Sequence, residues 1–241
     1  MKAFPAEQTM GVNVPLDIEI HSQQGREALR VPVSSLIIAG WTGRDKAAML
    51  HHIRELEALG VAPPASTPIF YRLAASRLTS ASHIETSGPD SSGEVEFVLL
   101  RHAGQLYVGI GSDHTDRRVE VYSITVSKQM CDKPVGRTFW PYDEVAPHWD
   151  QLLLRATIRE DGKDVIYQEG GIAKMLHPET LLAQLAESDG ALADGGVIFG
   201  GTLAAIGGIR PSPRMEVALI DPVLDRAIVH RYDVKELPMR G

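Results

Sequence analysis

Alternating apolar and polar positions predict that most of the chain forms β-strands. Residues 16–20 alternate leucine or isoleucine with acidic side chains, a two-residue period that is typical of a half-buried strand. Residues 94–100 alternate in the same way. Residues 36–39 and 106–110 are apolar runs that each end next to a glycine. We therefore predict a strand at each of these four places.

Two hairpins are predicted in the second half of the chain. Asp161 and Gly162 form a dipeptide that favours a tight two-residue turn. A second turn is expected at Asp221 and Pro222. The flanking strands are expected at residues 152–158 and 165–168, and at residues 215–220 and 226–234.

The period changes from two residues to that of a helix in residues 45–59. Met49, Ile53 and Leu56 share one face there, and Gly60 is placed to end the helix. Residues 178–187 predict a second, shorter helix with a proline in its first turn.

Two segments have no clear period. Residues 83–93 are polar and predict a loop. Residues 119–126 are rich in residues that favour strands, but their pattern is ambiguous between strand and other structure.

The predicted elements are mainly strands, with about two helices. The 22 glycines and 15 prolines among 241 residues agree with a chain that turns often. We therefore expect a mainly β or α+β fold, in the form of a mixed, mostly antiparallel β-roll that resembles a β-sandwich and carries peripheral helices.

Charge and cysteine content exclude several classes of function. The net charge of −7 comes without a basic cluster, so nucleic acid is not an expected partner. The single cysteine, Cys131, excludes an internal disulfide and a thiolate zinc site. Residues 1–20 lack the pattern of a secretory signal, and no apolar run is long enough to span a bilayer. We therefore expect a cytoplasmic protein that does not bind membranes.

Acidic side chains gather at the ends of two predicted strands. Glu94 and Glu96 are two residues apart, so both carboxylates lie on one face of their strand. This pair fits either a solvated edge strand or a cation site. Residues 111–117 follow the next strand and contain two aspartates, a histidine and an arginine. Converging carboxylates require a cation, and oxygen ligands without sulfur favour Mg²⁺, Mn²⁺ or Ca²⁺ over Zn²⁺.

The order of these motifs resembles that of the fumarylacetoacetate hydrolase (FAH) superfamily. That family carries a Glu-x-Glu strand, an Asn-Asp-Val-Ser-Ala-Arg-Asp type segment, a lysine ahead of Pro-x-Gly, a glutamine after an Asn-Gly hairpin and a Gly-Asp-Val-Ile-x-Thr-Gly-Thr-Pro segment. The matching residues here are Glu94 to Glu96, Ser112 to Arg117, Lys128 ahead of Pro134 and Gly136, Asp161 and Gly162 with Gln168, and Gly195 to Thr202. The chain resembles a divergent bacterial branch of that superfamily.

The resemblance implies roles for individual residues. The metal ligands are expected to be Glu94, Glu96 and Asp113, with Mg²⁺ or Mn²⁺ as the ion. The catalytic residues are expected to be Lys128, Arg117, His52 and Glu55. The residues that bind the substrate are expected to be Thr202, Gln168 and Arg72. The resemblance also implies a FAH-like catalytic domain at residues 36–241, with residues 1–35 as a strand segment packed on it.

Some of these roles have alternatives in the sequence. The pair His52 and Glu55 also fits an exposed ion pair on a solvated helix. His51 is a rival for the role of His52, because extra residues precede the helix. Lys128 also fits a surface lysine, and Arg117 fits a structural partner of a neighbouring acidic residue. Arg72 stands where the family has a lysine.

The resemblance implies a metal-dependent hydrolase that cleaves a C–C bond in a small 1,3-dicarbonyl or acylpyruvate-like 2-oxo acid in catabolism. In this reading the metal and Lys128 stabilise an enolate, and His52 with Glu55 activates water. The alternatives are a decarboxylase, hydratase or isomerase that uses the same site, or a non-catalytic protein that binds a metal and a ligand. The expected partners are a small organic acid and a second copy of the chain in a homodimer.

Overall fold

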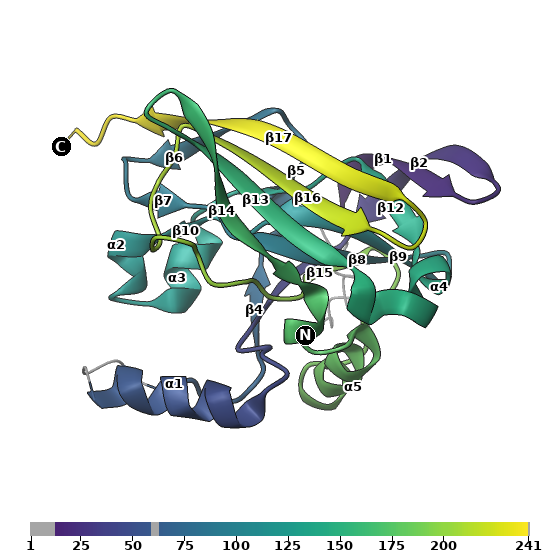
Figure 1. Ribbon diagram of the computed structural model, residues 1–241, viewed down its shortest axis with the longest axis horizontal. Coiled ribbons are helices and arrows are strands. Elements are labelled where there is room, and N and C mark those ends of the chain that lie inside the picture. Colours follow the sequence, from purple (N-terminus) through teal and green to yellow (C-terminus); the bar gives the residue numbers. More distant parts are fainter. Residues whose placement is uncertain (1–12, 59–62, 241) are drawn as a thin grey trace, which may run out of the picture.

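Two large β-sheets form the body of the protein (Figure 1). The computed structural model describes residues 13–58 and 63–240, without the side chains of residues 52, 55, 56 and 58. In this part of the chain the larger sheet has eight strands. In spatial order they are β2 (Gly25–Val33), β1 (Val14–Ser22), β12 (Thr138–Pro141), β9 (Gln105–Ser112), β8 (Val95–His102), β15 (Gly196–Phe199), β3 (Ser35–Gly40) and β4 (Ile69–Leu73).

The second sheet has five strands among the described residues. They are β14 (Lys163–Gly171), β13 (Leu153–Glu160), β16 (Arg214–Asp221), β17 (Arg226–Leu237) and β6 (His83–Ser87). Both predicted hairpins lie in this sheet, as β13 with β14 and as β16 with β17. Four short strands form two further pairs. In one pair β10 (Thr115–Asp116) lies beside β7 (Ser91–Ser92), and in the other β11 (Lys133–Pro134) lies beside β5 (Leu78–Thr79).

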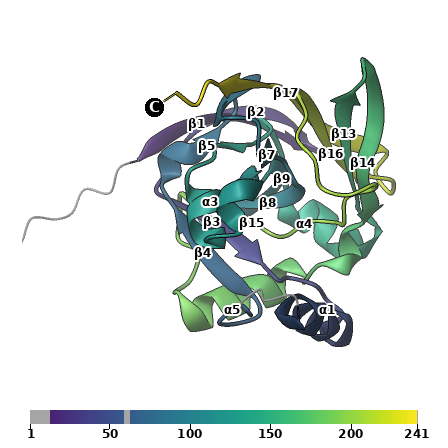
Figure 2. The ribbon, with the colours of Figure 1, turned by 90° about the vertical axis from the view of Figure 1, so that its left-hand side faces the viewer.

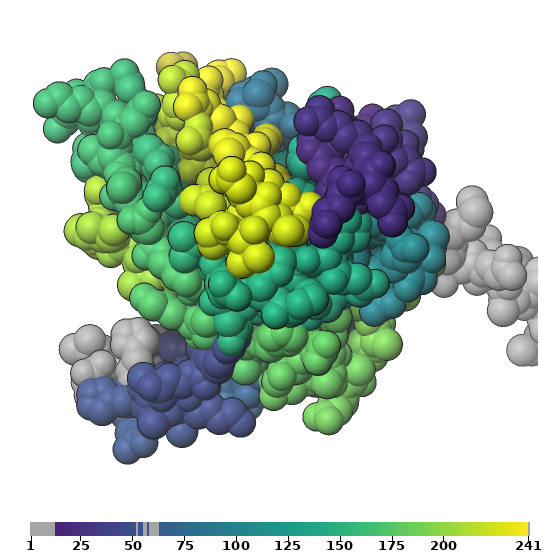
Figure 3. Space-filling view, turned by 45° about the vertical axis from the view of Figure 1, so that its right-hand side comes forward, coloured from purple at the N-terminus to yellow at the C-terminus, as the bar shows by residue number. Residues whose placement is uncertain are grey.

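Helices lie at the periphery of the sheets (Figure 2). The α-helices are α1 (Lys46–Ala58), α2 (Arg117–Glu120), α3 (Ile124–Gln129), α4 (Tyr142–Val145) and α5 (Pro178–Ser188). Three 3₁₀ turns are η1 (Ala75–Arg77), η2 (Ala146–Gln151) and η3 (Ile172–Lys174). Helix α1 and the hairpin of β1 and β2 stand at opposite ends of the molecule (Figure 3). None of the described helices has the length and apolar character that crossing a lipid bilayer requires.

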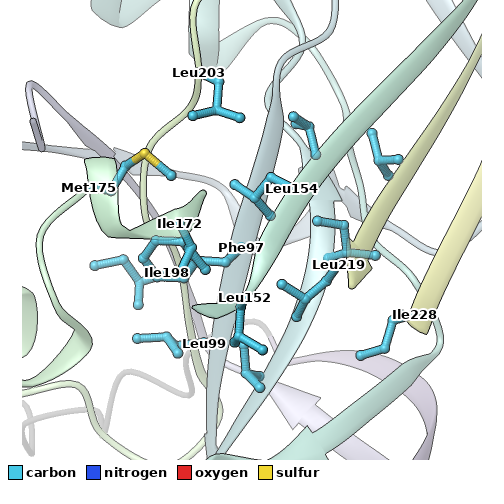
Figure 4. Packing of buried hydrophobic residues seen from close by; sticks show 14 of the residues in the cluster. Phe97, Leu99, Leu152, Leu154, Ile172, Met175, Ile198, Leu203, Leu219 and Ile228 are labelled. Atoms are coloured by element: carbon cyan, nitrogen blue, oxygen red, sulfur yellow. The ribbon is translucent and has the colours of Figure 1, made fainter. Parts of the chain in front are cut away.

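The larger sheet is buried on both of its faces. On β3, Ile37 and Ala39 belong to one apolar cluster, whereas Leu36 and Ile38 belong to another. Successive side chains of a strand point to opposite faces, so the same sheet separates the two clusters. The first cluster fills the space between the sheets (Figure 4). This arrangement confirms the predicted fold, which is a mainly β fold in the form of a mixed β-roll with peripheral helices.

One prediction about local structure is wrong, and one segment that the sequence left ambiguous is now assigned. Residues 83–93 are not a loop throughout, because β6 adds a parallel strand beside β17 and β7 pairs with β10. Residues 119–126 are mainly helical and turn structure rather than strand. Asp116 and Ser123 explain this result, since each side chain accepts a hydrogen bond from a backbone N–H in the first turn of a short helix.

Candidate metal centre

The structure brings together the three carboxylates that the sequence singled out. Strands β8 and β9 form an antiparallel hairpin in which Val95 lies opposite Ser112. Glu94 and Glu96 flank Val95, and Asp113 directly follows Ser112. The Asp113 N–H donates to the Glu94 carbonyl at 2.9 Å. One oxygen from each of the three carboxylates lies within 4.8 Å of the other two.

Two of these carboxylates are almost completely buried. Burial and the neighbouring charge of Asp113 raise the pKa of Glu96 well above its ordinary value. The Gly201 N–H donates to Glu96 Oε2 at 2.8 Å and partly offsets that rise. Burial alone would raise the pKa of Asp113 too, but Lys128 and Lys133 lower it below its ordinary value. Asp113 is therefore held as a carboxylate.

Three cationic side chains face the three carboxylates. Lys128 Nζ contacts Asp113 Oδ2 directly and lies 3.9 Å from Glu94 Oε2. Lys133 Nζ lies 3.3 Å from Asp113 Oδ1, and Arg117 Nη2 lies 3.2 Å from Glu94 Oε1. Burial alone would lower the pKa of Lys128, but the carboxylates raise it above its ordinary value. Lys128 is thus an ammonium ion, not a free surface lysine.

The donor set fits a hard divalent cation. Asp113 Oδ1 is buried, yet no described residue donates a hydrogen bond to it, so a lone pair is left for a metal. Every candidate ligand atom in the group is a carboxylate oxygen. Oxygen ligands of this kind suit Mg²⁺, Mn²⁺ or Ca²⁺. Glu94 keeps partial exposure, so the cluster meets solvent on the side of this carboxylate.

Arg117 lies beside the carboxylates and is fixed by several partners. Its Nε donates to Ser92 Oγ at 2.6 Å, and its Nη1 donates to Glu120 at 3.0 Å. Asp116 is not its partner, because that side chain accepts the Val119 N–H at the start of α2. Arg117 therefore presents a fixed positive charge next to Glu94.

Gln168 and Thr202 connect the glycine-rich loop after β15 to β8. Gln168 Oε1 accepts the Val95 N–H at 2.9 Å, and its Nε2 donates to Thr202 Oγ1 at 2.8 Å and to the Leu203 carbonyl. Thr202 Oγ1 donates to the Val95 carbonyl at 2.8 Å. Gln168 is 1 % exposed, and its amide holds the loop in place through these contacts.

Arg72 points away from the carboxylates. Its Nε donates to Asp189 Oδ2 at 2.9 Å, at the end of α5. Neighbouring residues of a strand face opposite sides, so the preceding residue, Tyr71, faces the site instead. The Tyr71 ring centroid lies 5.9 Å from Lys128 Nζ. Tyr71 was missed in the sequence, although the alternation along β4 carries the signal.

Replacing Arg72 with methionine is expected to leave turnover unchanged and to cost about 0–1 kcal/mol of stability, the usual worth of an exposed ion pair. The neighbouring substitution Tyr71→Leu is the matched comparison and is expected to lower turnover, because it removes the ring beside Lys128. Steady-state kinetics and urea unfolding of both variants test this pair. A large loss of turnover in the Arg72 variant alone would show that Arg72 reaches the substrate.

The predicted base pair, His52 and Glu55, lies on α1, but both side chains fall outside the described residues. His51, the rival for the role of His52, is exposed on the same helix. The assignment of a base to this helix stays a prediction.

His114 is not among the converging groups, although it follows Asp113 directly. Its Nδ1 lies 2.9 Å from Ser91 Oγ, and its Nε2 lies 2.9 Å from the Tyr232 hydroxyl. Burial lowers the pKa of His114 to about 3, so the ring is neutral. Through these two contacts the ring anchors the chain next to Asp113.

The sequence pattern of one protein family, described as "Protein of unknown function (DUF2848)", matches residues 39–232. No curated protein matches the sequence significantly.

Several solved structures are similar to this chain. Yeast ynq8, described as a fumarylacetoacetate hydrolase family protein, has 17 % identity and a TM-score of 0.61, with 86 % of this chain and 95 % of that chain covered. A 2-keto-3-deoxy-D-arabinonate dehydratase complexed with magnesium and 2,5-dioxopentanoate has 16 % identity and a TM-score of 0.59, with 88 % and 77 % covered. Cg1458 with inhibitor has 15 % identity and a TM-score of 0.64, with 89 % and 81 % covered. The chain therefore belongs to the DUF2848 family, and it has the fold of the fumarylacetoacetate hydrolase proteins.

Proposed function

We propose that this chain is a metal-dependent enzyme that cleaves a C–C bond in a small 1,3-dicarbonyl or acylpyruvate-like 2-oxo acid by hydrolysis. The observation that carries the proposal is the set of three carboxylates within 4.8 Å of one another, with Lys128 and Arg117 beside them. Glu94, Glu96 and Asp113 would hold Mg²⁺ or Mn²⁺. When bound, such an ion supplies a Lewis acid that stabilises negative charge on oxygen.

The cationic side chains suit an anionic substrate. Lys128 and Arg117 offer fixed positive charge where a carboxylate or a developing oxyanion would lie. In hydrolysis the oxygen of water bonds to the carbonyl carbon, and the bond from that carbon to the central carbon breaks. The electron pair of the broken bond passes into the remaining carbonyl group as an enolate, which then takes up a proton. His52, oriented by Glu55, is the proposed base for the water.

The same site also supports a second group of reactions, in which a 2-oxo acid is decarboxylated, hydrated, dehydrated or isomerised. The similar fold of a dehydratase that was solved with magnesium and a dioxo acid favours keeping this candidate. These reactions also develop negative charge on a carbonyl oxygen, but decarboxylation and isomerisation need no activated water. A protein that only binds a metal and a ligand is the third candidate.

A substrate screen tests the proposal. The purified protein is incubated with a panel of 2-oxo and 1,3-dicarbonyl acids, with Mg²⁺, with Mn²⁺ or with a chelator, and products are identified by mass spectrometry. Two acid fragments that together contain one added water are expected, and only with metal. The His52→Ala variant is expected to lose hydrolysis.

Other outcomes of the screen identify the alternatives. Release of CO₂, or a product of altered hydration, from a 2-oxo acid would replace the hydrolase with the second candidate. Metal binding without turnover of any acid would support the binding protein, and no metal binding at all would reject the metal centre. The homodimer and the cytoplasmic location stay predictions from the sequence.

A further inference from the structure

A second lysine, Lys133, lies behind the metal centre and has no assigned role. It is completely buried. Its ammonium group donates to the carbonyls of His114 at 2.6 Å, Lys128 at 2.6 Å and Cys131 at 2.9 Å. Three acceptors use all three hydrogens of an ammonium group, whereas a neutral amine has only two. The three carbonyls therefore match the three hydrogens of an ammonium group.

Both ends of the Lys133 side chain are fixed. Its backbone lies in β11, which pairs with β5 so that Lys133 is opposite Leu78. Its ammonium group joins two separate segments, since the His114 carbonyl follows β9 and the Lys128 carbonyl belongs to α3. The first segment carries Asp113 and the second carries Lys128, and the Lys128 ammonium group contacts the Asp113 carboxylate. Lys133 thus fixes the position of one segment relative to the other.

The position of Lys133 also affects one specific atom of the metal centre. Its Nζ lies 3.3 Å from Asp113 Oδ1, the buried oxygen that accepts no hydrogen bond from the described residues. The three carbonyls take the hydrogens of Lys133, so its charge attracts this oxygen without using its lone pairs. The oxygen is therefore oriented by Lys133, yet it remains able to bind a cation.

We propose that Lys133 is a positioning residue of the metal centre. It fixes the orientation of the Asp113 side chain and sets Lys128 against the other oxygen of that side chain. This inference rests on the proposed metal-dependent function. Replacing a residue that orients a metal ligand typically costs about 10- to 100-fold in metal affinity.

Mn²⁺ binding to purified, metal-stripped protein tests the proposal without any assay of activity. Lys133→Met, which removes the charge and all donors, is expected to weaken Mn²⁺ binding by about 10- to 100-fold in calorimetric titrations. Lys133→Gln keeps an amide donor for the carbonyls but not the charge, and its affinity is expected to lie between those of Lys133→Met and the wild type. The exposed Lys163→Met is the matched control and is expected to bind Mn²⁺ like the wild type.

The outcomes separate this inference from the function on which it rests. Folded Lys133 variants that bind Mn²⁺ as tightly as the wild type would overturn the role of Lys133 and leave the metal centre intact. A wild-type protein that binds no Mn²⁺ would reject the proposed function instead.

A measurement on proteins that keep Lys133 decides the case even if its variants do not fold. In ¹⁵N-lysine-labelled protein, Lys133 is expected to give an ammonium signal that is protected from exchange, persists in Lys128→Met and shifts when Mg²⁺ is added. The absence of such a signal, or a signal that Mg²⁺ leaves unchanged, would overturn the proposal.

Discussion

Replacing Lys128 with methionine is expected to lower kcat by about 10²- to 10³-fold, the usual cost of removing one fixed charge from a site where an oxyanion develops. Methionine keeps the length of the side chain but removes the ammonium that lies against Asp113 and near Glu94. Mn²⁺ binding should survive, because the three carboxylates remain and Lys133 still holds Asp113 in position. Steady-state kinetics on the substrate found in the screen, together with calorimetric Mn²⁺ titration, measure the two effects separately.

The control for this experiment is Lys163→Met, which makes the same change on an exposed hairpin strand and should alter neither quantity. If Lys128→Met retained the kcat of the wild type, Lys128 would serve only to balance the charge of Asp113. If it lost Mn²⁺ binding together with activity, the lysine would be part of the scaffold of the metal centre rather than a group that acts on the substrate.

Replacing Phe97 with alanine is expected to destabilise the protein by about 3–5 kcal/mol, the typical cost of deleting a buried aromatic ring. Phe97 is completely buried and packs edge to face against Trp149, with ring centroids 5.2 Å apart. The ring also lies directly under the loop after β15, since a Cβ on Gly200 would be 1.9 Å from Phe97 Cζ. The cavity would therefore loosen the loop whose Gly201 N–H binds Glu96. Urea unfolding followed by tryptophan fluorescence measures the loss.

Phe70→Ala is the matched comparison, because Phe70 is only partly buried at the edge of the same core. Its cost should be clearly smaller. Equal losses for the two variants would mean that the packing between Phe97, Trp149 and Gly200 contributes nothing beyond ordinary apolar burial.

The carboxylates of the metal centre could be predicted because their arrangement is local. Glu94 and Glu96 share a face through the two-residue period of a strand, and Asp113 comes next to them through the hairpin that follows. Short sequence distances and one regular period therefore decide where these three side chains lie. The two hairpins of the second sheet were predictable for the same reason.

The sequence did not indicate that Lys133 and Tyr71 lie next to the carboxylates. The burial of Lys133 depends on the pairing of β11 with β5, whose residues are far away in the sequence. Its short context resembles that of any surface lysine before a proline. Arg72 was assigned to the site because it stands where the family has a lysine. The order of motifs does not determine the face of a strand, and a shift of one residue changes that face. The pairing of β6 with β17 is equally distant in sequence.

The metal centre carries as many cations as carboxylates, and this balance has a consequence for how the protein matures. Clusters of like charge often need their ion before the chain can close around them, which ties folding to the supply of metal. Here Lys128 and Lys133 lie against Asp113, and Arg117 lies against Glu94, so the chain itself supplies positive charge to the cluster. We therefore expect the protein to complete its fold without the proposed ion, and we expect a chelator to leave the fold intact.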